Sequence, residues 1–253
     1  MYEEIISRNW GFLTAEDQAK IKDSRILLAG CGLGSNVARL AARTGFSRFV
    51  LADGDNVEAS NLNRQAFRSE HIGRNKAEVS GEMVREIIPE ADVKIFPHFI
   101  TDKEAHDLVT EVELVVNTVD PGPALFTINS AAQSQNKIVF FPMNIGFGGV
   151  VLVFTADSMT LENMLAGDVP QDKIFLRLIE RITVYVPYIS SYLKKLKTSI
   201  DDILSGVLPG PQLGVAAYLS SALVVTAMVK RVRGQPLPLA PEPLTLDAWF
   251  YNQ

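Results

Sequence analysis

Short apolar runs alternate with amphipathic runs along the first 155 residues of the chain. The apolar runs have the length of buried strands, and in the runs between them apolar residues recur with helical spacing. The pattern predicts strands at 26–29, 49–52, 93–96, 114–117, 138–141 and 150–154. It predicts helices at 35–44 and 76–88, and a third helix that ends at Ala132. Strands that alternate with helices favour a parallel sheet. We therefore predict an α/β fold with a mostly parallel sheet and helices on both of its faces.

The pattern changes in the remainder of the chain. Residues 157–205 are helical in pattern and carry more charge. A long apolar helix is predicted at 213–232, and a proline-rich, extended tail at 234–243. We therefore interpret residues 1–156 as the core, and residues 157–253 as a helical insertion and C-terminal part of the same domain.

Composition and charge narrow the class of protein. The chain has 253 residues, of which 47% are hydrophobic and 21% are charged, the balance of a soluble globular protein. Its net charge of -5 argues against nucleic acid or an anionic membrane as the main partner. The N-terminus has no apolar signal segment, and the stretch 213–229 is short for a membrane span and contains Ser and Thr. We expect a cytoplasmic protein that is not embedded in a membrane.

A glycine-rich turn follows the first predicted strand, where Gly30, Gly32 and Gly34 lead into a predicted helix. Small residues let the backbone approach a ligand closely, and a helix N-terminus offers free N–H groups to phosphates. Asp53 ends the next strand about 20 residues further on, where a carboxylate can bind ribose hydroxyls in a Rossmann-like fold. Such a turn can also serve only tight packing of strand and helix, but together with Asp53 it favours a nucleotide site.

A polar block, Asn61-Leu62-Asn63-Arg64-Gln65, comes next, and Lys76 opens the following predicted helix. Considered singly, Arg64 and Lys76 are typical of a solvated loop. Two cations and several amides near a nucleotide suit a triphosphate better than the pyrophosphate of a dinucleotide. The block therefore favours ATP over NAD.

Asp120 lies just beyond the predicted strand 114–117. The carboxyl ends of parallel strands line the ligand crevice, and a carboxylate that faces phosphates there is suited to holding Mg²⁺. The alternative is that Asp120 caps a helix before Pro121.

Taken together, these segments resemble the ThiF/MoeB family, which is related to the ubiquitin-activating enzymes. The matching segments, in order and at family-like spacing, are LAGCGLGS (28–35), ADGD (52–55), NLNRQ (61–65), GRNKAE (73–78) and VNTVD (116–120). The segments GFG (146–148) and GPQLG (210–214) also look like the family, and the resemblance is weakest at 157–205.

The resemblance implies roles for the matching positions. The nucleotide site would be formed by Gly30, Gly32, Gly34, Asp53, Asp55, Asn61, Arg64, Gln65 and Lys76. Within it Asp53 would bind the ATP ribose, and Asn61, Arg64 and Gln65 would contact the phosphates. The catalytic residues would be Arg64, Lys76, Asp120 and Arg8. Lys76 would neutralise phosphate charge, and Asp120 would be the Mg²⁺ ligand. Arg8 is the candidate for an arginine that the family often supplies across a dimer interface, and the alternative is an ordinary surface arginine.

The resemblance further implies an ATP-dependent adenylyltransferase that activates a carboxylate as its acyl-adenylate and releases pyrophosphate. The expected substrate is the C-terminus of a ubiquitin-like or sulfur-carrier protein, or a peptide or small-molecule acid. The expected cofactors are ATP and Mg²⁺, and a homodimer is expected. Two alternatives remain, namely an NAD(P)-dependent oxidoreductase and a non-catalytic partner subunit of a heterodimeric activating enzyme.

Three departures from the family pattern stand out. Ala29 and Cys31 occupy positions where the family loop usually has glycine. Cys31 is the only cysteine, so the chain cannot form the paired CxxC zinc motifs of many members, and we expect no zinc. It also has no downstream cysteine for a thioester, and we interpret Cys31 as a small buried residue and not as a nucleophile.

Overall fold

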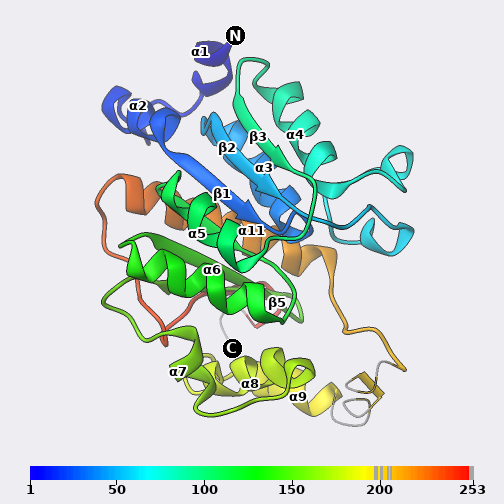
Figure 1. Ribbon diagram of the computed structural model, residues 1–253. Coiled ribbons are helices and arrows are strands. Elements are labelled where there is room, and N and C mark those ends of the chain that lie inside the picture. The colour runs from blue at the N-terminus through cyan, green and yellow to red at the C-terminus, as the bar shows by residue number, and fades with distance from the viewer. Residues whose placement is uncertain (197–198, 200–201, 204, 206, 251–253) are drawn as a thin grey trace.

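In the part of the chain that the structure describes, seven strands form one sheet (Figure 1). The computed structural model describes residues 1–196, 199, 202–203, 205 and 207–250. The strands are β1 (Arg25–Ala29), β2 (Arg48–Ala52), β3 (Asp92–Phe96), β4 (Leu114–Asn117), β5 (Ile138–Ile145), β6 (Gly148–Phe154) and β7 (Leu244–Asp247). Their order across the sheet is β3-β2-β1-β4-β5-β6-β7. Neighbours from β3 to β5 pair in parallel, and β6 and β7 are added antiparallel.

The strand order reverses between β1 and β4, which lie side by side at the centre of the sheet. In open α/β sheets a ligand binds outside the carboxyl ends of the strands at such a reversal. The parallel part of the sheet therefore confirms the predicted mostly parallel, Rossmann-like fold class, and it fixes where a ligand crevice belongs.

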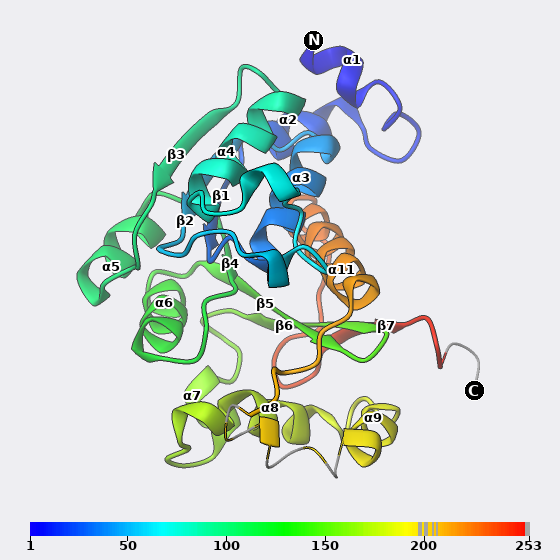
Figure 2. The same cartoon turned by 90° about the vertical axis from the view of Figure 1, so that its right-hand side faces the viewer.

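Helices cover both faces of the sheet (Figure 2). The α-helices in the described residues are α1 (Tyr2–Ile6), α2 (Ala15–Asp23), α3 (Leu33–Thr44), α4 (Lys76–Ile87), α5 (Asp102–Thr110), α6 (Pro123–Ser134), α7 (Leu161–Leu165), α8 (Ile174–Ile182), α9 (Ile189–Leu196) and α11 (Gly214–Val232). Short 3₁₀ helices are η1 (Ala59–Asn61), η2 (Ser69–His71) and η3 (Gln171–Lys173). Buried residues of α3, α4 and α11 pack on one face, and those of α5 to α9 pack on the other.

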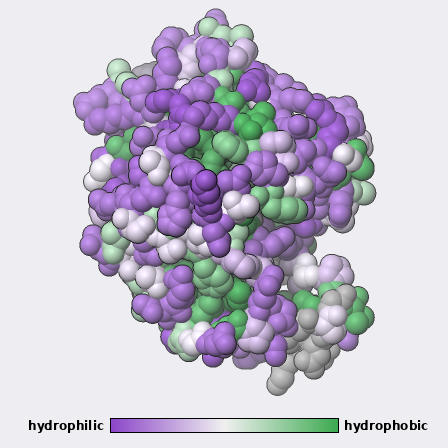
Figure 3. Space-filling view, in the orientation of Figure 1, coloured by the Kyte–Doolittle hydropathy of each residue, from purple (hydrophilic) through white to green (hydrophobic). Residues whose placement is uncertain are grey.

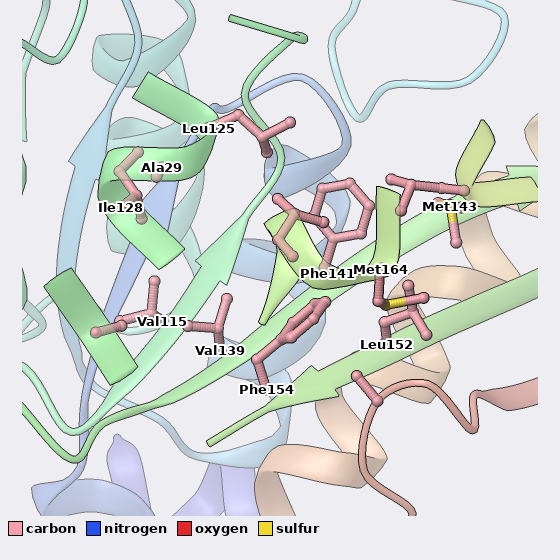
Figure 4. Close-up of a cluster of buried hydrophobic side chains, with 14 of the residues drawn as sticks. Ala29, Val115, Leu125, Ile128, Val139, Phe141, Met143, Leu152, Phe154 and Met164 are labelled. Carbon is pink, nitrogen blue, oxygen red and sulfur yellow. The ribbon is translucent and has the colours of Figure 1, made fainter. Parts of the chain in front are cut away.

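β1 shows why its apolar run forms a central strand. Successive side chains of a strand point to opposite faces. Ile26 and Leu28 enter the cluster under α3 and α11, whereas Leu27 and Ala29 enter the cluster under α5 and α6. A strand buried on both faces needs apolar residues at consecutive positions, as the sequence has here. Figure 4 shows Ala29 among the side chains of the second cluster.

The last third of the chain returns to the sheet. α11 packs against α3 and β6, and a Cβ added at Gly149 would lie 2.5 Å from the backbone nitrogen of Ser220, so glycine permits this close contact. α7, α8 and α9 form a layer beside β5 and β6 (Figures 1 and 2). The predicted helices 174–182 and 189–196 match α8 and α9. The last residues of the predicted second region, 251–253, lie outside the described residues.

By length and composition, α11 is the one helix among the described residues that could cross a membrane. Its buried residues, among them Ala217, Val224 and Met228, pack against the rest of the fold, and 44% of its apolar window is buried. The opposite side of the molecule, viewed in Figure 3, is mainly hydrophilic with separate hydrophobic patches.

Candidate active site

The glycine-rich turn joins β1 to α3 at the reversal of strand order. The backbone nitrogen of Gly30 donates to Ala52 O at 2.9 Å, and its φ of +89° lies in the left-handed region. A Cβ at Gly30 would lie 2.7 Å from Thr118 O, so the position requires glycine. Gly32 is the N-cap of α3. The turn therefore presents the N-terminus of a 12-residue helix to the crevice.

Asp53 connects this turn to the segment after β2. Its Oδ2 accepts from the backbone nitrogen of Cys31 at 2.6 Å, and its Oδ1 accepts from that of Asp55 at 2.8 Å. Burial raises the pKa of the Asp53 carboxyl, and the two N–H donors oppose that shift. Each carboxylate oxygen has a second lone pair, so Asp53 can still accept a hydrogen bond from a ligand.

Lys76 is a largely buried cation beside Asp53. Its Nζ lies 3.0 Å from Asp55 Oδ2, and the residue is 8% exposed. Asn75 fixes the position of Lys76. Its side-chain oxygen caps α4 by accepting from the backbone nitrogens of Ala77 and Glu78, and its Nδ2 donates to Asp53 O at 2.9 Å. The structure thus brings three predicted residues, Asp53, Asp55 and Lys76, to the carboxyl end of β2.

The 61–65 block forms a structured loop over the glycine turn. Asn61 is buried, and its Oδ1 accepts from Glu58 N at 3.0 Å. Arg64 donates to two neutral oxygens, Ser60 O and Asn63 Oδ1, and forms no ion pair among the described residues. A Cβ at Gly32 would lie 3.1 Å from Gln65 Nε2, so the Gln65 amide rests on the turn.

Two buried amide oxygens in this loop region lack hydrogen-bond partners among the described residues. They are Gln65 Oε1 and Asn36 Oδ1. The Nδ2 atom of the same Asn36 side chain donates to Arg64 O at 2.7 Å. Buried polar atoms without partners are rare in native proteins and invite a ligand or water as the missing partner. Both atoms are hydrogen-bond acceptors, so the missing partner must be a donor, such as a water molecule, and a phosphate oxygen cannot supply it.

Asp120 follows β4 on the neighbouring strand end. Its side chain is exposed and has no hydrogen bond or ion pair in the part of the chain that is described. The helix-cap alternative is wrong, because α6 begins at Pro123 and its N-cap is Gly122. Asp120 lines an open cleft of about 450 Å³ with Pro121, Gln171 and Asp172. Its carboxylate is free to bind a ligand.

Arg8 is not brought to this site within one chain. The N-terminal segment packs at the far end of α3, where Tyr2 Oη donates to Gly45 O at 2.7 Å and Asn9 Nδ2 donates to Thr44 O at 3.2 Å. α3 has 12 residues, about 18 Å of helix between that end and the glycine turn. Arg8 is exposed there, so it could act only on another subunit.

Some residues at the site were not identified from the sequence. Thr118 joins the ends of β4 and β1, since its Oγ1 donates to Gly30 O at 2.8 Å. Gln171 of η3 donates to Pro121 O, which attaches the helical segment to the Asp120 loop. Asn75 could have been found, because an Asn before Lys-Ala-Glu is a helix N-cap signal. Nothing in the sequence signals that Gln171 approaches position 121.

Cys31 is fully buried, as the sequence interpretation expects. Burial raises the pKa of its thiol, which keeps it protonated and unreactive. No group of three or more His, Cys, Asp or Glu side chains among the described residues could hold a metal by itself.

A family comparison settles the relationship. The model of the ThiF family matches residues 6–252. The chain belongs to the ThiF family. The match extends from the N-terminal segment through α11 and β7, so it includes the stretch 157–205 in which the sequence resemblance is weakest.

Curated relatives share about a third of their aligned residues with this member of the ThiF family. The sulfur carrier protein ThiS adenylyltransferase of Escherichia coli K12 is 32% identical over 145 residues, which cover 56% of this chain and 58% of the relative. The sulfur carrier protein adenylyltransferase of Thermus thermophilus is 30% identical over 141 residues, 55% of this chain and 52% of the relative. The matches thus span little more than half the length of these relatives.

Solved structures confirm the fold over most of the chain. E. coli MccB bound to MccA-N7isoASN superposes with a TM-score of 0.68 at 18% identity, covering 92% of this chain and 64% of that one. E. coli MccB with ATP superposes with a TM-score of 0.65 at 18% identity, and the alignment covers 92% of this chain and 63% of the MccB chain. At this identity the likeness establishes the fold alone.

Proposed function

We propose that this protein is an ATP-dependent adenylyltransferase that activates a carboxylate as an acyl-adenylate. The observation that carries the proposal is the meeting of the Gly30 turn, the Asp53–Asp55–Lys76 group and the free Asp120 carboxylate at one edge of a ThiF-family sheet. These groups supply what a triphosphate needs, namely N–H donors, a ribose acceptor, a buried cation and a metal ligand.

The proposed reaction is attack of a substrate carboxylate oxygen on the α-phosphorus of ATP. A new bond forms between that oxygen and the α-phosphorus, the bond from the α-phosphorus to the bridging oxygen breaks, and pyrophosphate leaves. A carboxylate is already ionised at neutral pH, so no general base is required. Catalysis then rests on positioning and on neutralising charge at the phosphates.

ATP would be held by residues that are already ordered around the glycine turn. Asp53 would accept from the ribose, and the N-terminus of α3 and the 61–65 loop would face the phosphates. Arg64 supports this role, because its hydrogen bonds go to neutral oxygens and leave its positive charge uncompensated by a carboxylate in the described residues. Lys76 is paired with Asp55, so it would contribute as a hydrogen-bond donor within an ion pair and not as an uncompensated charge.

Mg²⁺ would be held by Asp120 together with the phosphates. When bound, the ion would withdraw charge from the leaving pyrophosphate. The position of Asp120 supports this assignment, because its exposed carboxylate follows the end of β4 at the edge of the sheet where a ligand crevice belongs.

The first substrate to test is the C-terminal carboxylate of a sulfur-carrier or other ubiquitin-like protein. Two of the similar curated relatives are named as adenylyltransferases of sulfur carrier proteins. A peptide or small-molecule acid is the second class. The cleft beside Asp120 is open to solvent and is compatible with either class.

A homodimer is part of the proposal. α11 exposes Val215 (50%) and Tyr218 (58%), and Leu246 of β7 is 42% exposed, which are large apolar side chains for a free surface. A second copy would cover them and could bring its own Arg8 toward the site. The proposed dimer would act in the cytoplasm without a membrane partner, and the net charge of -5 argues against nucleic acid as its main partner.

The proposal is tested by ATP–pyrophosphate exchange measured with a panel of carboxylates that includes Gly-Gly-ending carrier proteins. Asp120→Ala should lower exchange by about 100-fold or more, since it removes charge stabilisation at the phosphates, while leaving the melting temperature unchanged. Asp107→Ala is the matched control, because Asp107 is an exposed carboxylate on α5. Full exchange in Asp120→Ala would remove Asp120 as the metal ligand.

The two rival functions make different predictions. An NAD(P)-dependent oxidoreductase has no use for Arg64, Lys76 and Asp120 around its pyrophosphate, and it would bind a nicotinamide nucleotide in place of ATP. A non-catalytic partner subunit would show no exchange with any carboxylate, and Asp120→Ala would then change nothing.

A further inference from the structure

Two asparagines lie within the apolar core below the end of β4. Asn117 ends β4 and Asn129 is on the second turn of α6, and both are 0% exposed. Leu125 and Ile128 of α6 and Val115 of β4 belong to the apolar cluster of this face (Figure 4). Because both asparagines are fully buried, neither can touch a ligand in the open cleft.

The Asn117 side chain ties three backbone segments together. Its Nδ2 donates to Asn129 Oδ1 at 2.9 Å and to Leu125 O, in the first turn of α6, at 3.0 Å. Its Oδ1 lies 3.5 Å from the backbone nitrogen of Val119, the residue before Asp120. The amide therefore joins the end of β4, the loop that carries Asp120 and the start of α6.

This arrangement is unfavourable for stability alone. Asn129 Nδ2 is buried without a hydrogen-bond partner among the described residues, and such a donor loses its bonds to water on folding. Two apolar side chains of similar shape would avoid that loss. The pair is therefore explained better by the geometry it imposes than by the stability it adds.

The opposite side of the same loop is fixed to β1. Thr118 N donates to Ala29 O at 2.8 Å, and Thr118 Oγ1 donates to Gly30 O at 2.8 Å. The loop thus has anchors on the glycine turn and on α6, in addition to the hydrogen bond from Gln171 of η3 to Pro121 O. The Asp120 side chain has no anchor of its own in the described residues, so its position depends on these neighbours.

We infer that Asn117 and Asn129 are a positioning pair that holds the Asp120 loop in register with the glycine turn. Asn129 orients the Asn117 amide, and Asn117 fixes Val119 and the start of α6. The function of this geometry, presenting Asp120 to a metal–nucleotide complex, rests on the proposed function. The pair acts through Asp120 and is not itself catalytic.

Asn129→Ala tests the inference, because it removes the acceptor without touching the loop. Two readouts are measured on the full chain: hydrogen exchange of the peptide 117–124 without ligand, and the rise in melting temperature with Mg·ATP. We expect about tenfold faster exchange of that peptide and loss of most of the Mg·ATP-dependent rise. Asn129→Ser is the second variant if the alanine protein does not fold, since a serine hydroxyl is too short to replace the amide.

Ile128→Ala is the matched control, because it creates a cavity in the same helix without removing a polar contact. It should lower the melting temperature but keep both the slow exchange of 117–124 and the full rise with Mg·ATP. The inference would be overturned if Asn129→Ala and Ile128→Ala changed both readouts equally. It would also be overturned if hydrogen exchange of 117–124 stayed as slow in Asn129→Ala as in the wild type. If wild-type protein shows no rise with Mg·ATP, the proposed function fails, and the exchange of 117–124 still decides whether the pair positions the loop.

Discussion

At the scale of single residues, Gly30 shows how a backbone requirement becomes a site. The sequence predicts that the backbone approaches a ligand closely at this turn. The structure shows why the position requires glycine, since its φ is left-handed and Thr118 leaves no space for a Cβ. Substituting a larger residue must either strain the backbone or separate the ends of β1 and β4. Both consequences damage the crevice in which a nucleotide would bind.

Gly30→Ala should destabilise the protein by about 1–3 kcal/mol, because of the φ strain and the contact with Thr118 O. Urea denaturation measures the difference in unfolding free energy between the wild-type and Gly30→Ala proteins. Gly210→Ala is the control, since no atom lies within 4 Å of a Cβ at Gly210, and it should change stability by less than about 0.5 kcal/mol. An unchanged midpoint in Gly30→Ala would contradict the assignment of a glycine-only position.

The residue scale also shows where sequence reasoning stops. Asp53, Lys76 and Asp120 could be selected because each stands at a strand end or a helix start, positions that a pattern of elements predicts. Their hydrogen-bond partners could not be selected in the same way. Gln171 approaches Pro121 from 50 residues away, and the contact depends on how η3 folds back over the sheet.

At the scale of elements, the C-terminal strand β7 is held by one buried carboxylate. Asp247 is 5% exposed, and its Oδ2 accepts from Tyr192 Oη of α9 at 2.9 Å. Its Oδ1 accepts from the backbone nitrogens of Trp249 and Phe250 at 2.8 and 2.9 Å. Tyr192 Oη in turn accepts from Phe147 N in the β5–β6 turn. Asp247 therefore joins α9, the β5–β6 turn and the C-terminal segment.

Asp247→Ala should cost roughly 3 kcal/mol of unfolding free energy, because it leaves three donors without their acceptor. Tyr192→Phe removes only the hydroxyl and should cost about 1 kcal/mol. The exposed Asp157→Ala serves as the control and should be neutral. Denaturant unfolding measures all three, and an Asp247→Ala protein as stable as the Asp157→Ala protein would show that the carboxylate does not hold β7.

The elements were predicted unequally well. β1, β2, β4, α8 and α9 match their predicted ranges to within a residue, because each is a short apolar or strongly amphipathic run. β7 was not predicted. Its four residues follow a proline-rich tail, and they form a strand because Gly148–Val151 offers a free edge. α2 and α5 were also missed, although each begins with a Thr capping box that the sequence contains.

At the scale of the whole molecule, the proposed dimer would complete the site with an arginine from the second subunit. Arg8 lies at the end of α3 away from the glycine turn, so any catalytic role requires the partner of a dimer. The exposed apolar residues of α11 and β7 give such a dimer a surface.

Mixing two inactive variants tests this arrangement. If Arg8 acts on the partner's site, Arg8→Ala and Asp120→Ala proteins should each be inactive. When the two proteins are mixed and their subunits redistribute, about half of the dimers contain one subunit of each variant. Each such dimer has one intact site of two, so about a quarter of the wild-type ATP–pyrophosphate exchange activity should return. Light scattering establishes the oligomeric state beforehand. A monomer, or no recovery on mixing, would contradict a shared site and leave Arg8 as a surface residue.

The central claim is that the crevice binds Mg·ATP, and a thermal-shift comparison tests it most directly. A ligand that binds only the folded state must raise the melting temperature, and no knowledge of the carboxylate substrate is needed. Mg·ATP, NAD and NADP are compared, each at millimolar concentration. We predict that Mg·ATP raises the melting temperature and that the nicotinamide nucleotides do not. A rise with NAD or NADP and none with Mg·ATP would contradict the account.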